Sequence, residues 1–188
     1  MNSQTGDGPP RAALIAALVI AVGSLVALLV VAAVLQRSPE QEPVAISEVP
    51  APEADSPDCR ALVEALPDEL GDYRRAAVRD PAPVGAAAWQ REEPGEEALI
   101  LRCGVGRPGE FVVGAPLQVV DAVQWFRVGE AGVGDQAGGD RSTWFAVDRP
   151  VYVALTLPPG SGSAPIQVIS KTIAEKLQER PVDPAPVG

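Results

Sequence analysis

The apolar and polar residues of this chain form one long apolar run followed by short periodic segments. Residues 12–35 make a run of 24 residues without a charge. As a helix rising about 1.5 Å per residue, this run would extend about 36 Å, enough to cross the ~30 Å hydrocarbon core of a bilayer. The apolar core of a cleaved signal peptide has only about 7–15 residues. We therefore predict an uncleaved transmembrane signal anchor, with a cleaved signal peptide as the alternative.

The charges beside the apolar run indicate its orientation. Arg11 and the amino terminus precede the run, whereas Arg37 and several acidic residues follow it. Basic residues favour the cytoplasmic side and acidic residues contribute little, so the margin is about one charge. We predict a cytoplasmic stub over residues 1–11, a transmembrane helix over residues 12–35, and the chain after residue 35 outside the cell.

The segment after the run has the composition of a linker. Residues 36–56 contain four prolines and several carboxylates. Proline and like charge both extend a chain, which gives a reach of up to about 60 Å. We expect either a spacer across a layer of the envelope or an ordinary disordered linker.

Two segments with helical periodicity enclose the remaining chain. Ser56 is a suitable N-cap before Pro57, and apolar residues then recur on one helical face: Cys59, Leu62, Val63 and Leu66. A second helix is expected from Ser163 to about residue 179, and its apolar stripe has four members: Ile166, Ile169, Ile173 and Leu177. Each helix therefore has one face to bury.

Alternating apolar residues predict strands between these helices. Residues 86–91 and 97–105 form one expected hairpin, and residues 143–147 and 151–157 form another. Residues 117–128 add strand pattern, broken near residue 121. The prediction is an α+β domain over residues 57–180, with a mainly antiparallel sheet and two flanking helices. Three prolines after residue 180 predict a disordered tail over residues 181–188.

Charge and composition exclude several kinds of function. Beyond residue 37 the chain carries 24 acidic and 13 basic residues, which disfavours nucleic-acid binding. The chain contains no histidine, so histidine-dependent nucleophiles and the usual zinc and copper ligands are absent. The carboxylates of one turn lack the spacing of a calcium loop and are expected to be solvated: Glu92, Glu93, Glu96 and Glu97. We predict no catalytic residues, no metal and no cofactor.

Two cysteines, Cys59 and Cys103, occur in the domain that we place outside the cell. An even number of cysteines in an exported domain usually forms disulfides. Cys59 lies on the apolar helix face, and Cys103 shares a strand face with Leu99 and Leu101, so a bridge would join helix to sheet. The alternative is two free buried thiols in a cytoplasmic domain.

The three tryptophans, Trp89, Trp125 and Trp144, all lie in predicted strands. Core packing is the usual role of such residues. If two of them faced outward together, they would form a binding patch for a protein or a glycan. Both possibilities are open from the sequence.

Several phrases, in this order along the chain, resemble a known family: residues 59–62, 66–67, 87–89, 101–105, 123–125 and 148–151. Together they resemble the actinobacterial family of domain of unknown function 3515, whose members are small membrane-anchored or secreted proteins. Members often carry a further cysteine after the phrase at residues 101–105, and this chain has none there. The family has no known activity, so the resemblance implies a location and an architecture only.

We expect a single-pass membrane protein of the bacterial cell envelope that contacts the bilayer through residues 12–35. Its outer domain is predicted to bind an envelope protein or wall component without catalysis. The alternative is a small-ligand or lipid-binding domain with an apolar pocket between sheet and helices. An envelope hydrolase that uses carboxylates is a third possibility. The oligomeric state, the partner and the process are not indicated.

Overall fold

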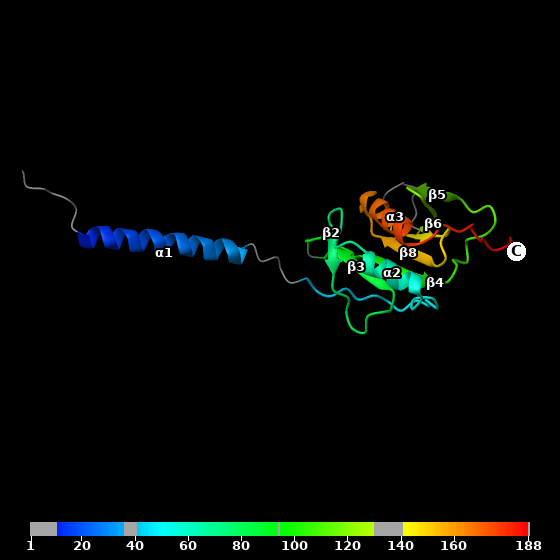
Figure 1. The fold of residues 1–188 in the computed structure, drawn as a ribbon, viewed down its shortest axis with the longest axis horizontal. Helices are drawn as coiled ribbons and strands as arrows, with labels where there is room; N and C mark the ends of the chain where they lie inside the picture. Colours follow the sequence, from blue (N-terminus) through cyan, green and yellow to red (C-terminus); the bar gives the residue numbers. More distant parts are fainter. Residues whose placement is uncertain (1–10, 36–40, 94, 130–140, 188) are drawn as a thin grey trace, which may run out of the picture. The chain divides into compact units, whose positions relative to one another are not determined.

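The structure is a computed structural model that describes residues 11–35, 41–93, 95–129 and 141–187. Over these residues the chain forms three helices and eight strands (Figure 1). It divides into two compact units, residues 1–40 and residues 41–188. The second unit contains the sheet and is called the domain below.

The N-terminal apolar run is one continuous helix, α1 (Arg11–Leu35). Its segment Leu14–Ala32 has a mean hydropathy of 3.1, and it is long and apolar enough to cross a membrane. A signal sequence near the N-terminus meets the same criteria. The predicted helix is confirmed, whereas residues 1–10 of the predicted cytoplasmic stub lie outside the described residues.

The domain is built on one eight-stranded sheet in the order β1-β2-β3-β4-β8-β7-β6-β5. Every neighbouring pair of strands is antiparallel, as predicted for an α+β domain. The strands are β1 (Glu69–Leu70), β2 (Tyr73–Ala76), β3 (Ala86–Gln90), β4 (Leu99–Val105), β5 (Leu117–Val120), β6 (Val123–Gly129), β7 (Ser142–Ala146) and β8 (Tyr152–Leu157). The break predicted near residue 121 is the turn between β5 and β6, where Asp121 has a φ of 52°.

Both predicted helices are present, α2 (Pro57–Ala65) and α3 (Ala164–Lys176), and they contact each other. The Ser56 hydroxyl accepts a hydrogen bond from the backbone N–H of Cys59, which caps α2 as expected. Ser163 makes no such side-chain bond at the start of α3. This helix also ends before the predicted residue 179, because Leu177 has already left the helical conformation.

The helices cover one face of the sheet, which we call the helical face. Its core joins the apolar stripes of both helices to the inward residues of the strands. Its fully buried members include Leu62, Leu99, Leu101, Leu155, Ile169 and Ile173. The predicted alternation in β4 and β8 is therefore confirmed, and the space between sheet and helices is filled.

The opposite face, called the outer face, is covered in part by residues 41–56, which we call the strap. Val44 pairs with Val78 in a parallel bridge and is buried. The backbone N–H of Glu53 donates to the carbonyl of Gly104 at 3.1 Å, and Ala54 is buried beside it. The predicted linker over residues 36–56 is thus wrong for residues 41–56, because Val44, Ile46 and Ala54 pack on the domain.

A second covering of the outer face, the C-terminal cover, consists of residues 106–116 and 182–187. Val112 and Ala185 pair in a parallel bridge, and the N–H of Val113 donates to the Ala185 carbonyl at 2.8 Å. Val182 packs on an apolar cluster that contains Phe111 and Phe126, whose ring centroids lie 5.3 Å apart. The predicted disordered tail is therefore wrong over residues 181–187.

Candidate functional site

A groove crosses the outer face between the strap and the C-terminal cover, and we call it the strap groove. Its volume is about 450 Å³. Residues 49–50 of the strap form one wall, and Arg107, Pro108 and Glu110 of the cover form the other. The floor comes from outward residues of four strands: Arg102, Val128, Thr143, Phe145, Ala154 and Thr156.

Strand register orders the floor of the strap groove into two rows. Arg102, Ala154 and Phe145 stand opposite one another across β4, β8 and β7. In the next row the hydroxyls of Thr143 and Thr156 lie 3.0 Å apart and hydrogen-bond to each other. The two threonine hydroxyls therefore satisfy each other. The charged group of the floor is the guanidinium of Arg102.

Arg102 also lines a second groove, of about 530 Å³, on the other side of strap residues 49–50. Its side chain therefore lines both grooves. Burial lowers the pKa of the Arg102 guanidinium, and the nearby positive charge of Arg141 lowers it further. Both effects mean that this cation stands in a site that would gain from a negative charge.

A third groove, of about 500 Å³, lies at the β1–β2 turn and is rich in carboxylates. Its arginines are already paired, Arg74 with Glu92 at 3.3 Å and Arg91 with Glu96 at 2.7 Å. The acidic turn predicted as solvated is therefore partly ion-paired. Within the described ranges, no cluster of three cysteine, aspartate or glutamate side chains is placed like a metal site.

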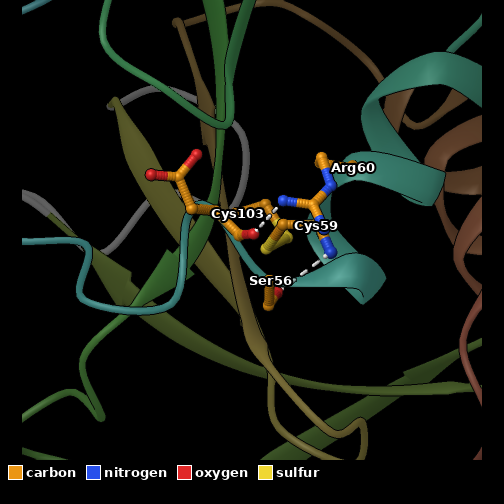
Figure 2. The surroundings of a disulfide bond; sticks show 5 residues. Ser56, Cys59, Arg60 and Cys103 are labelled. Atoms are coloured by element: carbon orange, nitrogen blue, oxygen red, sulfur yellow. Dashed lines mark hydrogen bonds between the residues drawn. A yellow bond between two sulfur atoms is a disulfide. The ribbon is translucent and has the colours of Figure 1, made fainter.

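Cys59 and Cys103 form the predicted disulfide, which joins α2 to β4 (Figure 2). Their Cα atoms lie 5.5 Å apart, and both side chains are fully buried. Beside the bridge, Ser56 caps the helix and the guanidinium of Arg60 donates to the carbonyl of Asp55 at 2.5 Å. The bridge is thus part of the packed interior and belongs to the fold, not to the groove.

The tryptophans do not form an outward patch. Trp89 and Trp125 are fully buried in the helical-face core, and Trp144 packs half-buried against the same core. The indole N–H of Trp89 donates to the Pro67 carbonyl at 2.9 Å, and that of Trp125 donates to the Ser170 hydroxyl at 2.9 Å. The patch hypothesis is wrong, because all three rings face the side that the helices cover.

The family model described as Protein of unknown function (DUF3515) matches residues 18–182. The chain belongs to this family. No curated protein matches the chain, and no solved structure matches it. The family match covers most of α1, the strap and nearly all of the domain, and the family has no described function.

Two phrases that carried the family resemblance have a structural role. Gly104, in the phrase at residues 101–105, has a φ of 79° and lies against the strap. A Cβ atom there would stand 2.3 Å from the backbone nitrogen of Ala54. Only glycine lets the strap approach β4 this closely.

The phrase at residues 148–151 contains a buried ion pair. Arg149 Nη1 and Asp148 Oδ2 lie 2.9 Å apart, and both side chains are almost fully buried. Asp148 Oδ2 also accepts from the N–H of Gln124, and Arg149 donates to the Ala122 carbonyl. Burial raises the pKa of Asp148, while these donors oppose the shift. The pair fastens the β7–β8 turn to the β5–β6 turn.

No sequence motif marks the residues of the strap groove, so they were not among the predicted site residues. Arg102 reads as one outward residue of a strand, and Thr143, Phe145 and Thr156 come from two other strands. One signal was available in the supposed linker, where Val44 and Ile46 interrupt the polar residues. Both residues pack on the outer face, so the linker composition concealed a structural segment.

Proposed function

We propose that this chain is a single-pass membrane protein of the cell envelope whose outer domain binds a protein or wall component without catalysing a reaction. The strap groove is the proposed contact site. The observation that carries this proposal is the groove itself, a partly apolar hollow with one cation in its floor on the face opposite α2 and α3. Concave sites with a few polar groups are typical of binding surfaces.

The location in this proposal rests on α1 and on the disulfide. A helix of this length and hydropathy suits a membrane anchor. A buried disulfide suits an oxidising compartment outside the cytoplasm. The positive charges of Arg11 and the amino terminus, against that of Arg37 after the helix, support a cytoplasmic N-terminus.

The non-catalytic part of the proposal rests on the lining of the groove. Among the described residues that line it, Glu110 is the one carboxylate, whereas carboxylate hydrolases use two that face each other. The alternative pocket between sheet and helices is not favoured, because that space is filled by the core. The groove itself is large enough for a small ligand, and this possibility is developed below.

Location is tested with a reporter cysteine, because Cys59 and Cys103 are buried and react poorly in the folded state. Glu175→Cys places a thiol on an exposed position of α3, and Asp7→Cys places one before α1. In intact cells a membrane-impermeant maleimide should label the first variant, and it should label the second only after lysis. The reverse pattern would put the domain in the cytoplasm and end the envelope proposal.

Binding at the groove is tested by photo-crosslinking in intact cells. A photoreactive residue at Glu110, on the groove wall, should give an adduct of defined mass with a cell-envelope component. The same residue at Lys171, which is exposed on α3, is the matched control on the other face. Adducts from Lys171 but none from Glu110 would refute the groove as the contact site.

A further inference from the structure

The floor of the strap groove contains one polar group whose hydrogen bonding is incomplete. Arg102 Nε is buried, and no acceptor among the described residues reaches it. Arg102 Nη2 has only a long contact of 3.4 Å with the carbonyl of Ser47 in the strap. A buried donor without a partner costs free energy, so this guanidinium is suited to an acceptor that comes from outside the chain.

The groove differs in charge from the rest of the domain. Beyond residue 37 acidic residues outnumber basic ones by 24 to 13. The lining of the strap groove carries Arg102 and Arg107 against Glu110. Arg107 is paired with Asp183 at 3.3 Å, so Arg102 is the cation of the lining that no described carboxylate pairs with. An anionic group is repelled by most of the surface but attracted here, which is the arrangement expected of a selective anion site.

Apart from the paired threonines, most of the remaining lining is apolar. Val105, Phe145 and Ala154 lie along the groove beside Arg102, and Val49 and Pro50 close it from the strap side. Val105 and Ala154 are almost fully buried. A ligand would therefore place an apolar body on the β8 and β7 part of the floor and its charge at β4.

From these observations we propose that the strap groove binds a ligand with a carboxylate attached to a small apolar body, and that Arg102 receives the carboxylate. A short peptide with a free C-terminus and a free branched-chain acid share this chemistry. The inference rests on the proposed function, because it names the ligand class of the same groove.

A carboxylate suits the donor set better than a phosphate. One planar guanidinium matches a planar monoanion through two parallel hydrogen bonds. Phosphate sites usually add the N-terminus of a helix or several further donors. Both domain helices lie on the opposite face, and the threonine hydroxyls of the floor are paired with each other.

The test uses the full chain, labelled with ¹⁵N-arginine, in nanodiscs of zwitterionic lipid. The Arg102 Nε–H signal is assigned as the one absent from Arg102→Lys. The probes are N-acetyl-valyl-alanine with a free carboxylate and its C-terminal amide, with empty nanodiscs as the blank. The acid should shift the Arg102 signal in a saturable way, and the amide should bind about tenfold more weakly or worse, since one charged hydrogen bond is lost.

Two variants and one further probe complete the test. Arg102→Gln should weaken the acid about tenfold, while the exposed Arg79→Gln should leave its affinity unchanged. Binding of 4-methylpentanoate as tightly as the peptide supports a free acid as ligand, and weaker binding supports a peptide terminus. The comparison of acid with amide on the unmodified chain needs no variant to fold.

Equal binding of acid and amide overturns the inference, and so does failure of the acid to bind at its solubility limit. Retention of the Glu110 crosslink in an Arg102→Gln background would then show that the groove binds something else. The proposed function would survive that result. If the photoreactive residue at Glu110 gave no crosslink while Arg102 was unchanged, the proposed function itself would be wrong.

Discussion

The two faces of the sheet are covered by different kinds of structure. On the helical face, α2 and α3 bury a continuous apolar core and the disulfide. On the outer face, the strap and the C-terminal cover are irregular, hold two smaller apolar clusters, and leave the strap groove between them. The apolar stripe of a helix buries a continuous area of the sheet. An irregular segment buries only the area beneath the few side chains that contact the sheet. We infer that one face supplies most of the stability and the other supplies the binding surface.

The largest effect should come from the disulfide on the helical face. Replacing Cys59 and Cys103 with serine should lower the free energy of unfolding by about 4 kcal/mol, because the bridge closes a long loop. Urea unfolding of the purified protein measures this loss, and a reducing agent should give the unmodified chain the same midpoint. If the affinity of the groove fell as well in the folded variant, the separation between the two faces would be wrong.

A slightly smaller loss is expected for a core tryptophan. Trp125→Ala should cost about 3–4 kcal/mol, because it empties a fully buried site and leaves the Ser170 hydroxyl without its donor. Trp144→Ala removes a half-buried ring on the same face and should cost about 1–2 kcal/mol. Thermal unfolding compares the two variants. If both variants lost the same stability, the greater burial of Trp125 would not explain its contribution.

The outer face can be tested at the contact between the strap and β4. Gly104→Ala should cost about 2–3 kcal/mol, because it combines a positive φ with a clash against Ala54. Gly114→Ala is the matched control, since its φ is 87° but nothing stands near its Cβ. It should cost about 1 kcal/mol. Limited proteolysis should cut the strap faster in the Gly104 variant only, and equal cleavage would show that the strap does not depend on this contact.

The smallest effect concerns Tyr73, a buried residue of the helical face whose ring lies 4.6 Å from the guanidinium of Arg91. Burial raises the pKa of Tyr73, although the charge of Arg91 opposes this shift. Near pH 7 both folded and unfolded states are protonated, so Tyr73→Phe should change stability by less than about 0.5 kcal/mol.

Above pH ~10 the unfolded tyrosine loses its proton first, so the unfolded state binds fewer protons and stability falls as pH rises. The phenylalanine variant lacks this loss and should become the more stable protein in that range. Urea midpoints between neutral and alkaline pH would reveal it. Parallel curves for both proteins would mean that Tyr73 titrates alike in the two states.

Sequence patterns predicted the helical face well for a physical reason. Residues such as Leu99, Leu101 and Cys103 must alternate because a strand presents every second side chain to one face. The helical stripe of Ile166, Ile169 and Ile173 follows from the helical repeat in the same way. The disulfide followed from both periodicities together, since each placed its cysteine toward the same core.

The outer face could not be predicted in this way because its coverings have no repeat. The strap is held by Val44, Ala54 and a few backbone hydrogen bonds, and its prolines and acids are those of a linker. Arg102 acquires its surroundings from segments that are distant in the sequence, such as Ser47 and Thr156. The groove therefore exists only in the folded domain, and no local sequence pattern predicts it.

The disulfide has a mechanical consequence for the path that leads from α1 into the sheet. Five residues, 36–40, separate α1 from the domain, and the strap leads from there to Cys59. In the membrane-anchored protein that we propose, tension applied through α1 would load the backbone hydrogen bonds of Val44 and Glu53 first. Once these yield, the load passes through the sulfur–sulfur bond directly to β4, a central strand. Traction could thus detach one wall of the groove while α2 and the sheet remain folded.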